Sequence, residues 1–273
     1  MDVKEHKIIS PDDKGKNDND YAASSWIVKV GKPLRKFINP VIRRSSKVGN
    51  TPVLDPAKFP WAEELANNWQ TIRAEAEDVL KYRQAIPSIS TISPDHSRLD
   101  AQKKWRSFFM WGYGFKSDFN CSRAPQTTAL VEKIPGLSTA MFSIHEPGMC
   151  ITPHKGVTAG ICVFHLGLIV PKNRENCAIR VDDQIYHWKE GEGFVFDDTF
   201  EHETWNKTNE QRAILLLHVK RPMRFPGSLL AALFMGAVRR TSFIQDALNS
   251  MKEWEESYKA MEAADHNQKA VAE

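Results

Sequence analysis

The chain has 273 residues, which suits one large domain or two small ones. Hydrophobic residues make up 41% and charged residues 26%, which is typical of a globular protein and excludes a mainly disordered one. The net charge of +3 is too small to indicate a nucleic-acid partner, and the four cysteines show no CxxC spacing that would indicate a zinc knuckle. Because the N-terminus is polar and no segment reaches the roughly 20 apolar residues that span a bilayer, we expect a cytoplasmic location.

The first 60 residues are predicted to form a disordered tail and a basic arm. Residues 1–28 mix polar and charged residues without hydrophobic periodicity, and residues 29–60 form the arm. Seven cations and no acid lie between Lys29 and Lys47, interleaved with apolar residues. Pro33 and Pro40 are expected to prevent one long helix. The arm is either a solvated segment or a surface that binds anionic lipid or another polyanion.

The next segments alternate between helix and strand. Residues 61–83 repeat apolar positions at steps of three and four, which predicts one amphipathic helix. Residues 85–98 are expected to form a loop. The aromatic-rich residues 105–113 indicate a strand, and residues 126–137 indicate a short helix.

Residues 140–221 contain about eight short β-type runs broken by turns, which are typical of a sandwich or barrel. No glycine-rich phosphate loop opens a helix, which excludes a Rossmann or P-loop protein. We therefore expect a domain over residues 61–222, made of a helix and a jelly roll. Residues 223–273 are apolar and helical in pattern, with an apolar stretch at 229–238, and are expected to pack on that domain or on a membrane.

Six histidines lie in or beside the β-rich region: His145, His154, His165, His187, His202 and His218. A single histidine is usually an ordinary surface or core residue, but His154 in TPHKG and His202 in FDDTFEHETWN stand out by their context. A jelly roll brings distant strands together, so these two imidazoles are compatible with one metal ion such as iron or zinc. Non-haem iron oxygenases generally add a carboxylate, but the position two residues after His154 is Gly156. Either a more distant acid or water then completes the site.

An ordered set of motifs over roughly residues 100–222 carries a family resemblance. The segments FSIHEPGMCITPHKG, VFHLGLIVP, CAIRV and HWKEGEGFVFDDTFEHETWN, followed by Arg212, resemble the aspartyl/asparaginyl β-hydroxylase family. Members of this family are Fe(II)- and 2-oxoglutarate-dependent dioxygenases. The resemblance implies a mainly β fold, a double-stranded β-helix (jelly roll) with flanking helices on its N- and C-terminal sides.

The resemblance also implies the site residues. His154 and His202 would bind Fe(II), which uses O2, and a glycine at position 156 fits the family pattern. Ser143, His165 and Arg212 would hold 2-oxoglutarate. A planar guanidinium pairs bidentately with a carboxylate, which is the physical reason for an arginine there.

Two features near these residues remain open. Family members commonly carry an arginine two residues before the histidine that matches His165, whereas this chain has Val163, so one carboxylate contact is in question. Ligating imidazoles usually donate to a carboxylate or a carbonyl group. We expect a structural role for Asp197 and leave the role of Asp198 open.

The segments outside the catalytic core indicate the substrate. KVGNTPVLDPAKFP and HVKRPMRFPGSLLAAL resemble bacterial lipid hydroxylases of the same superfamily, which 2-hydroxylate an acyl chain of lipid A or of ornithine lipid. We therefore expect hydroxylation of a membrane lipid by an enzyme bound peripherally to the anionic inner face of the bacterial inner membrane. The alternatives are hydroxylation of a free amino acid or of a peptide Asp/Asn side chain, and a non-catalytic metal-binding jelly roll. The oligomeric state is not predicted.

Overall fold

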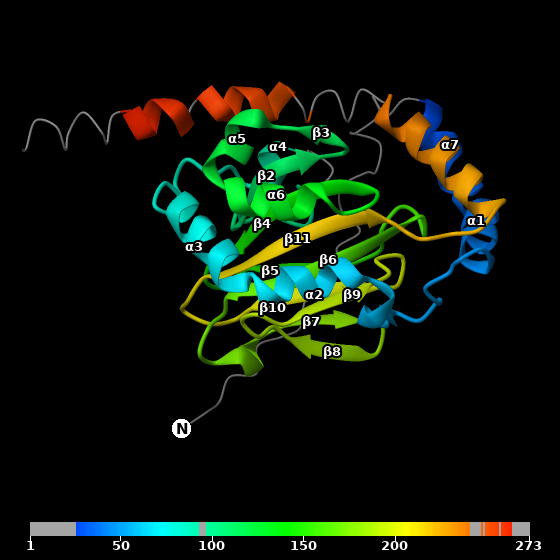
Figure 1. Cartoon of the computed structure of the whole chain (residues 1–273), viewed down its shortest axis with the longest axis horizontal. Coiled ribbons are helices and arrows are strands. Elements are labelled where there is room, and N and C mark those ends of the chain that lie inside the picture. Colours follow the sequence, from blue (N-terminus) through cyan, green and yellow to red (C-terminus); the bar gives the residue numbers. More distant parts are fainter. Residues whose placement is uncertain (1–25, 93–96, 241–246, 248, 257, 264–273) are drawn as a thin grey trace, which may run out of the picture.

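Two antiparallel β-sheets form the centre of the computed structural model, which describes residues 26–92, 97–240, 247, 249–256 and 258–263 (Figure 1). In spatial order, the seven strands of the larger sheet are β1 (Val53–Leu54), β9 (Gly193–Phe196), β6 (Ile161–Ile169), β11 (Arg212–Lys220), β4 (Leu137–His145), β2 (Trp105–Gly112) and β3 (Phe115–Lys116). The smaller sheet has the order β5 (Cys150–His154), β10 (His202–Asn206), β7 (Cys177–Val181) and β8 (Gln184–His187). From β4 to β11 the chain passes back and forth between the sheets, so the predicted double-stranded β-helix is confirmed.

The central strands β4, β6 and β11 of the larger sheet are buried on both faces, which explains their nearly continuous apolar sequences. Phe142 of β4 and Leu215 of β11 point toward the helices, whereas Met141 and Ile214 point toward the smaller sheet. Successive side chains of a strand alternate between faces. The same alternation therefore turns Ser143, His145 and Arg212 into the space between the two sheets.

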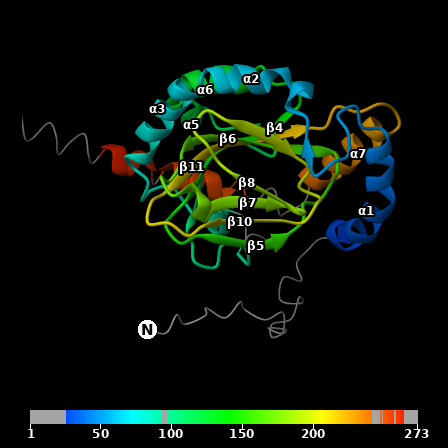
Figure 2. The ribbon, with the colours of Figure 1, turned by 90° about the horizontal axis from the view of Figure 1, so that it is seen from below.

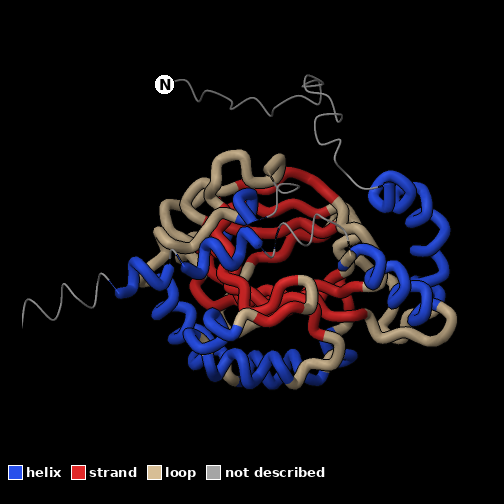
Figure 3. The backbone as a smooth tube through the Cα atoms, turned by 90° about the horizontal axis from the view of Figure 1, so that it is seen from above, coloured by secondary structure: helices blue, strands red, loops and turns tan. Residues whose placement is uncertain are grey.

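Helices cover the outer face of the larger sheet (Figures 2 and 3). They include α2 (Pro60–Asn67), α3 (Trp69–Leu80), α5 (Asp118–Arg123) and α6 (Pro125–Glu132). The predicted helix over 61–83 is present but divides at Asn68, whose side-chain amide donates to the carbonyl oxygen of Glu64. The strand and the helix expected at 105–113 and 126–137 are confirmed as β2 and α6.

Three short helices lie in the segments that connect these elements. A 3-10 helix, Pro56–Lys58, precedes α2. The loop expected at 85–98 contains α4 (Ile89–Ile92), in which Ile89 and Ile92 are buried. A second 3-10 helix, Arg174–Asn176, precedes β7.

After the barrel, the chain returns to helix. Residues 249–256 and 258–263 are helical, and Ala247, Met251, Trp254 and Tyr258 are buried, as the predicted stripe requires. Ile244 and Leu248, which belong to the same prediction, lie outside the described residues.

Helix α1 (Trp26–Arg44) corrects the expectation for the basic arm. It runs through Pro33 and Pro40, and it begins inside the segment expected to be disordered; residues 1–25 lie outside the described part of the chain. A proline inside a helix costs about 3 kcal/mol. Tertiary packing offsets that cost, because Ile42 is fully buried against Ala231 of α7 (Gly227–Arg239) and against Ala159.

Helices α1 and α7 lie side by side beyond one end of the barrel (Figures 1 and 2). Gly227 at the start of α7 donates its backbone N–H to Ser45 Oγ at 3.2 Å. Within the described residues, no helix is both long and apolar enough to cross a lipid bilayer.

Candidate active site

His154 and His202 face each other across the smaller sheet. Strands β5 and β10 pair with these two residues directly opposite, and the centroids of the two imidazole rings are 4.1 Å apart. This spacing suits two imidazoles on one ion, since metal–nitrogen bonds are about 2.0–2.1 Å long. The register of one strand pair therefore joins two residues that are far apart in the sequence.

The backbone fixes the tautomer of both rings. His154 Nδ1 lies 2.9 Å from the carbonyl oxygen of Thr152, and His202 Nδ1 lies 3.0 Å from that of Phe200. A carbonyl oxygen can only accept, so Nδ1 carries the proton in each ring and Nε2 keeps a lone pair. Burial lowers the pKa of both histidines, and burial together with the neighbouring His154 lowers the pKa of His202 to about 4. Both rings are thus held in the neutral form that ligates a metal.

Asp198 lies where a side chain at position 156 would otherwise be. A Cβ added to Gly156 would lie 2.1–2.3 Å from the carboxylate atoms of Asp198, so any side chain at position 156 would require Asp198 to move. Gly156 also donates its N–H to the backbone oxygen of Asp198 at 2.6 Å. Asp198 Oδ1 is buried without a hydrogen-bond partner, and burial, with repulsion from Asp197, raises the pKa of Asp198 to about 7. A distant acid thus occupies the space beside the first histidine.

The described residues contain no group of three or more His, Cys, Asp or Glu side chains arranged to hold a metal. Within this part of the chain, the site offers two facing imidazoles without a third such side chain grouped with them. An ion held by two imidazoles keeps other coordination positions open for substrate and oxygen, as an oxygenase requires.

A cavity of about 390 Å³ extends from the histidine pair between the two sheets. It is lined by the inward-facing residues of the strands, with additional apolar residues from α4, α7 and the loop after β5. Its polar lining includes Ser143, His145, His165, Arg212 and His218.

Arg212 is a buried cation beside this cavity. It is 1% exposed, and its guanidinium lies 4.4 Å from the centroid of the Trp188 ring. Nη1 donates to the carbonyl oxygen of Ser143 at 3.1 Å, while Nε has no hydrogen-bond partner. Among the described residues, no Asp or Glu influences the pKa of Arg212, which burial lowers to about 10. A buried charge without a counter-ion is costly, so this position favours an anionic ligand.

Ser143 and His165, the other two residues predicted to hold the cosubstrate, line the same cavity. Ser143 Oγ accepts a hydrogen bond from Trp105 Nε1 at 2.9 Å, which leaves its own proton free to donate. His165 is buried against the rings of Phe194 and Phe196, whose centroids lie 5.5 and 5.1 Å from that of its imidazole, and its Nδ1 has no partner.

His145 is a site residue to which the sequence alone assigned no role. It is opposite Arg212 in the β4–β11 register, it is 1% exposed, and its Nδ1 has no hydrogen-bond partner. Burial and the nearby Arg212 lower its pKa well below the usual value. Val163, at the position where an arginine was expected, also lines the cavity and is 3% exposed. His187, by contrast, is exposed on β8 and lies outside the cavity.

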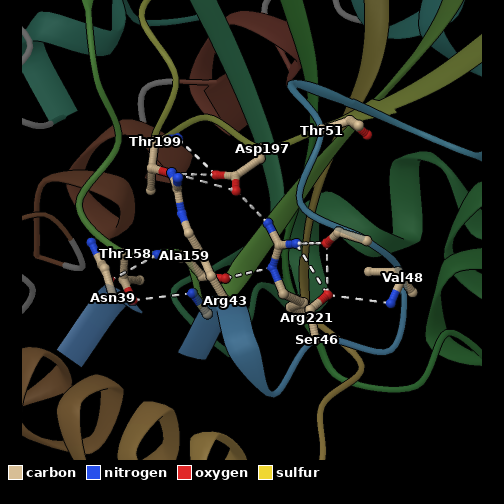
Figure 4. A network of polar contacts seen from close by, with 12 residues as sticks. Asn39, Arg43, Ser46, Val48, Thr51, Thr158, Ala159, Asp197, Thr199 and Arg221 are labelled. Atoms are coloured by element: carbon tan, nitrogen blue, oxygen red, sulfur yellow. Dashed lines mark hydrogen bonds and ion pairs between the residues drawn. The ribbon is translucent and has the colours of Figure 1, made fainter. Parts of the chain in front are cut away.

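A polar network anchors the loop before His202 (Figure 4). Asp197 and Arg221 have fully buried side chains and form an ion pair of 2.6 Å. Asp197 Oδ1 also accepts hydrogen bonds from the backbone N–H and the hydroxyl group of Thr199, at 3.0 and 2.5 Å. Asp197 therefore has the structural role expected for it: it fixes the loop that carries Asp198 and the carbonyl group of Phe200.

The profile of the aspartyl/asparaginyl β-hydroxylase family matches residues 66–222, which include every residue of this cavity predicted from the motifs. The chain belongs to this family of hydroxylases. It is 42% identical over 222 residues to an ornithine lipid ester-linked acyl 2-hydroxylase of Rhizobium tropici, covering 81% of this chain and 79% of that protein. It is also 32% identical over 169 residues to the human aspartyl/asparaginyl beta-hydroxylase, covering 60% of this chain but only 21% of the human protein.

Among solved structures, TT1209 from Thermus thermophilus aligns with a TM-score of 0.29 and 13% identity, over 44% of this chain and 87% of that one. The fold assignment depends on the strand order described above. The resemblance inferred from the motifs is confirmed by the family profile.

Proposed function

We propose that this hydroxylase is an Fe(II)- and 2-oxoglutarate-dependent dioxygenase that hydroxylates an acyl chain of a bacterial membrane lipid, and that ornithine lipid is its substrate rather than lipid A. The observation that carries the proposal is the 42% identity to the Rhizobium tropici ornithine lipid hydroxylase over about four-fifths of both chains. The reaction would take place at the membrane surface, with the enzyme in peripheral contact with anionic lipid.

The histidine pair supports iron binding. His154 and His202 would hold the ion through Nε2, because their Nδ1 atoms are committed to backbone carbonyl groups. Bound iron would supply the oxidation of 2-oxoglutarate by O2, which would yield succinate and CO2 and place the second oxygen atom in a substrate C–H bond. Asp198, whose carboxylate lies against Gly156 and has an unpartnered oxygen, would supply a further polar group beside the ion.

The buried guanidinium supports binding of a dicarboxylic acid. Arg212 would pair with the distal carboxylate of 2-oxoglutarate, which supplies the counter-ion that the protein lacks at this position. Ser143 and His165 would donate further hydrogen bonds, and His145 offers another polar atom where Val163 offers none. These residues hold and orient the cosubstrate and neutralise its charge.

The remaining lining supports an acyl chain. Most of the cavity wall is apolar, including Leu99, Phe109, Ile179, Met235 and Val238. An apolar wall holds a methylene chain by burial and excludes water from the reacting carbon. A free amino acid would leave most of this surface without complementary groups, which disfavours the amino-acid and peptide alternatives.

The test is reconstitution of the protein with Fe(II), 2-oxoglutarate and purified ornithine lipid. We expect succinate to form in step with a gain of one oxygen atom on the ester-linked acyl chain, measured by mass spectrometry. His154→Ala and His202→Ala should abolish both products, while His187→Ala, a change at an exposed histidine of the same sheet, should not. Full activity without either paired histidine would contradict the metal assignment. Oxygen gain on lipid A alone would change the substrate, and metal binding without turnover of any lipid would favour the non-catalytic module.

A further inference from the structure

The helix pair α1–α7 is held firmly against the end of the barrel. Ile42 of α1, Ala231 of α7 and Ala159 pack together and are buried. Asn39 Oδ1 accepts a hydrogen bond from the backbone N–H of Ala159 at 3.1 Å. The inner faces of both helices are therefore committed to the protein, which leaves their outer faces for another partner.

The outer faces carry an unusual number of exposed apolar side chains. Of the nine large hydrophobic residues that are exposed in the described part of the chain, five lie on or beside this helix pair: Leu34, Phe37, Phe225, Leu229 and Leu233. Phe37 is 74% exposed, Phe225 77% and Leu233 63%. Steps of three and four residues place Leu34 with Phe37, and Leu229 with Leu233, on single helix faces. Exposed apolar residues that cluster in this way indicate an interaction site.

The two segments that carry these residues have charges of one sign only. Neither residues 21–54 nor residues 211–245 contain an acid, although the chain has 34 Asp and Glu residues. The exposed cations of the described residues in these segments are Lys36, Arg44, Lys47, Lys220, Arg224 and Arg240. A second copy of the chain seated on this surface would bring like charges together, whereas an anionic bilayer complements both the cations and the apolar side chains.

The same helix reaches the catalytic cavity. Met235 and Val238 of α7 line the cavity that contains the histidine pair, whereas Leu229 and Leu233 of that helix face outward. Val157, in the loop after His154, lines the cavity and is 51% exposed. The cavity therefore opens beside the exposed apolar residues of the helix pair.

Helix α1 is also tied to the loops that precede and follow the metal-binding histidines (Figure 4). Arg43 donates to Thr199 Oγ1, in the loop before His202, and lies 3.8 Å from the carboxylate of Asp197. Asn39 binds the loop after His154 through Ala159. A surface that includes α1 thus has a fixed position relative to the active site.

We infer that the outer faces of α1 and α7 form the surface that docks the protein onto an anionic lipid bilayer, with the cavity mouth beside α7 turned toward the membrane. The identity of the chain that enters the cavity rests on the proposed function, but the docking itself does not. Exposed cations supply a contribution that salt screens, and the apolar side chains supply one that salt does not screen.

Vesicle flotation without iron or cosubstrate tests the docking surface. Full-length protein is mixed with vesicles of phosphatidylcholine, alone or with an equal part of phosphatidylglycerol, in about 0.1 M and about 1 M salt. We expect binding to the anionic vesicles that weakens with salt without vanishing. Each cation near an anionic leaflet strengthens binding about fivefold, so Lys36→Glu with Arg44→Glu should weaken binding about thirtyfold or more at low salt. The matched control, Lys172→Glu with Lys207→Glu, makes the same charge change at exposed cations outside these segments and should bind within a few-fold of wild type.

The apolar contribution is tested with Phe37→Ser and Leu233→Ser, which should remove the salt-resistant binding; Ile185→Ser, at an exposed apolar residue of β8, is the control. The inference is overturned if wild-type protein ignores anionic vesicles at low salt, if both sets of variants bind like their controls, or if Phe37→Ser and Leu233→Ser only dissociate a dimer measured by light scattering. Turnover of detergent-dispersed lipid is measured on the same variants. If the wild-type protein does not turn over this lipid, the proposed function is contradicted. Vesicle binding by the same protein would still support the docking surface.

Discussion

Replacing Arg221 with Met should severely destabilise the protein. The side chains of Arg221 and Asp197 are both 0% exposed, and the guanidinium also donates to the carbonyl oxygens of Ala159 and Gly49, at 2.6 and 2.9 Å. Methionine fills much of the same volume but leaves these groups unpaired, and Arg43, 3.8 Å from Asp197, is the remaining cation. Removing one partner of a buried ion pair costs about 3–5 kcal/mol.

Urea denaturation followed by circular dichroism measures this loss. With a denaturant slope of about 3 kcal/mol per M, the midpoint should fall by about 1 M or more. The control is Arg180→Met, which removes ion pairs of 2.6 and 3.3 Å from a side chain that is 24% exposed and should cost at most about 1 kcal/mol. Adding Asp197→Asn to Arg221→Met removes the stranded charge and should recover part of the loss. The buried-charge argument is refuted if Arg221→Met costs no more than Arg180→Met, or if Asp197→Asn recovers nothing.

Three further predictions concern the site, the thiols and the backbone. Arg212→Met should raise the 2-oxoglutarate concentration for half-maximal turnover about 10- to 100-fold, as expected for a lost charged hydrogen bond; an unchanged value would place the cosubstrate elsewhere. Burial raises the pKa of the Cys162 thiol to about 12, whereas Cys150 is exposed. Iodoacetamide at pH 8 should therefore alkylate Cys150 and spare Cys162, as measured by mass spectrometry. Equal labelling of the two thiols would contradict the burial of Cys162. Gly167→Ala would place a Cβ 2.1 Å from a neighbouring carbonyl oxygen and should cost about 3 kcal/mol in urea denaturation. Gly236 lies inside α7, and an added Cβ there has no atom outside the helix within 4 Å. Gly236→Ala should therefore raise the free energy of unfolding by about 0.5–1 kcal/mol.

The fold could be predicted largely because its signals are local. Alternating apolar runs and turns predicted the barrel, and the motifs around His154 and His202 predicted a histidine pair that the β5–β10 register brings together. Periodicity does not report how a helix is interrupted or supported. The break at Asn68 and the continuation of α1 through Pro33 and Pro40 depend on contacts with distant residues, so the sequence could not predict them.

The site shows the same division. Asp198 and Gly156 are distant in the sequence, and their contact follows only from how the two loops meet. The sequence alone does not distinguish His145 from the other histidines. Its role becomes visible only in the strand register, which places it opposite Arg212. Arg43 lies in the same basic stretch of sequence as the exposed cations around it. Its side chain nevertheless forms a contact within the protein, where it donates to Thr199 Oγ1. Sequence spacing identifies candidate ligands, but it does not separate paired from unpaired charges.

The edge of the larger sheet next to β2 bears on how the protein avoids aggregation. Strand β2 is rich in aromatic residues, and such a strand with an open edge would template pairing with another molecule. Its edge is covered: β3 pairs with Trp111 and Gly112, the backbone N–H of Ser107 donates to the carbonyl oxygen of Pro87 at 3.1 Å, and a bridge joins Arg106 to Ser88. If residues 86–88 detached while the barrel stayed intact, part of the edge of β2 would be left unpaired and could pair with a strand of another molecule. This short segment therefore protects the protein from self-association during partial unfolding.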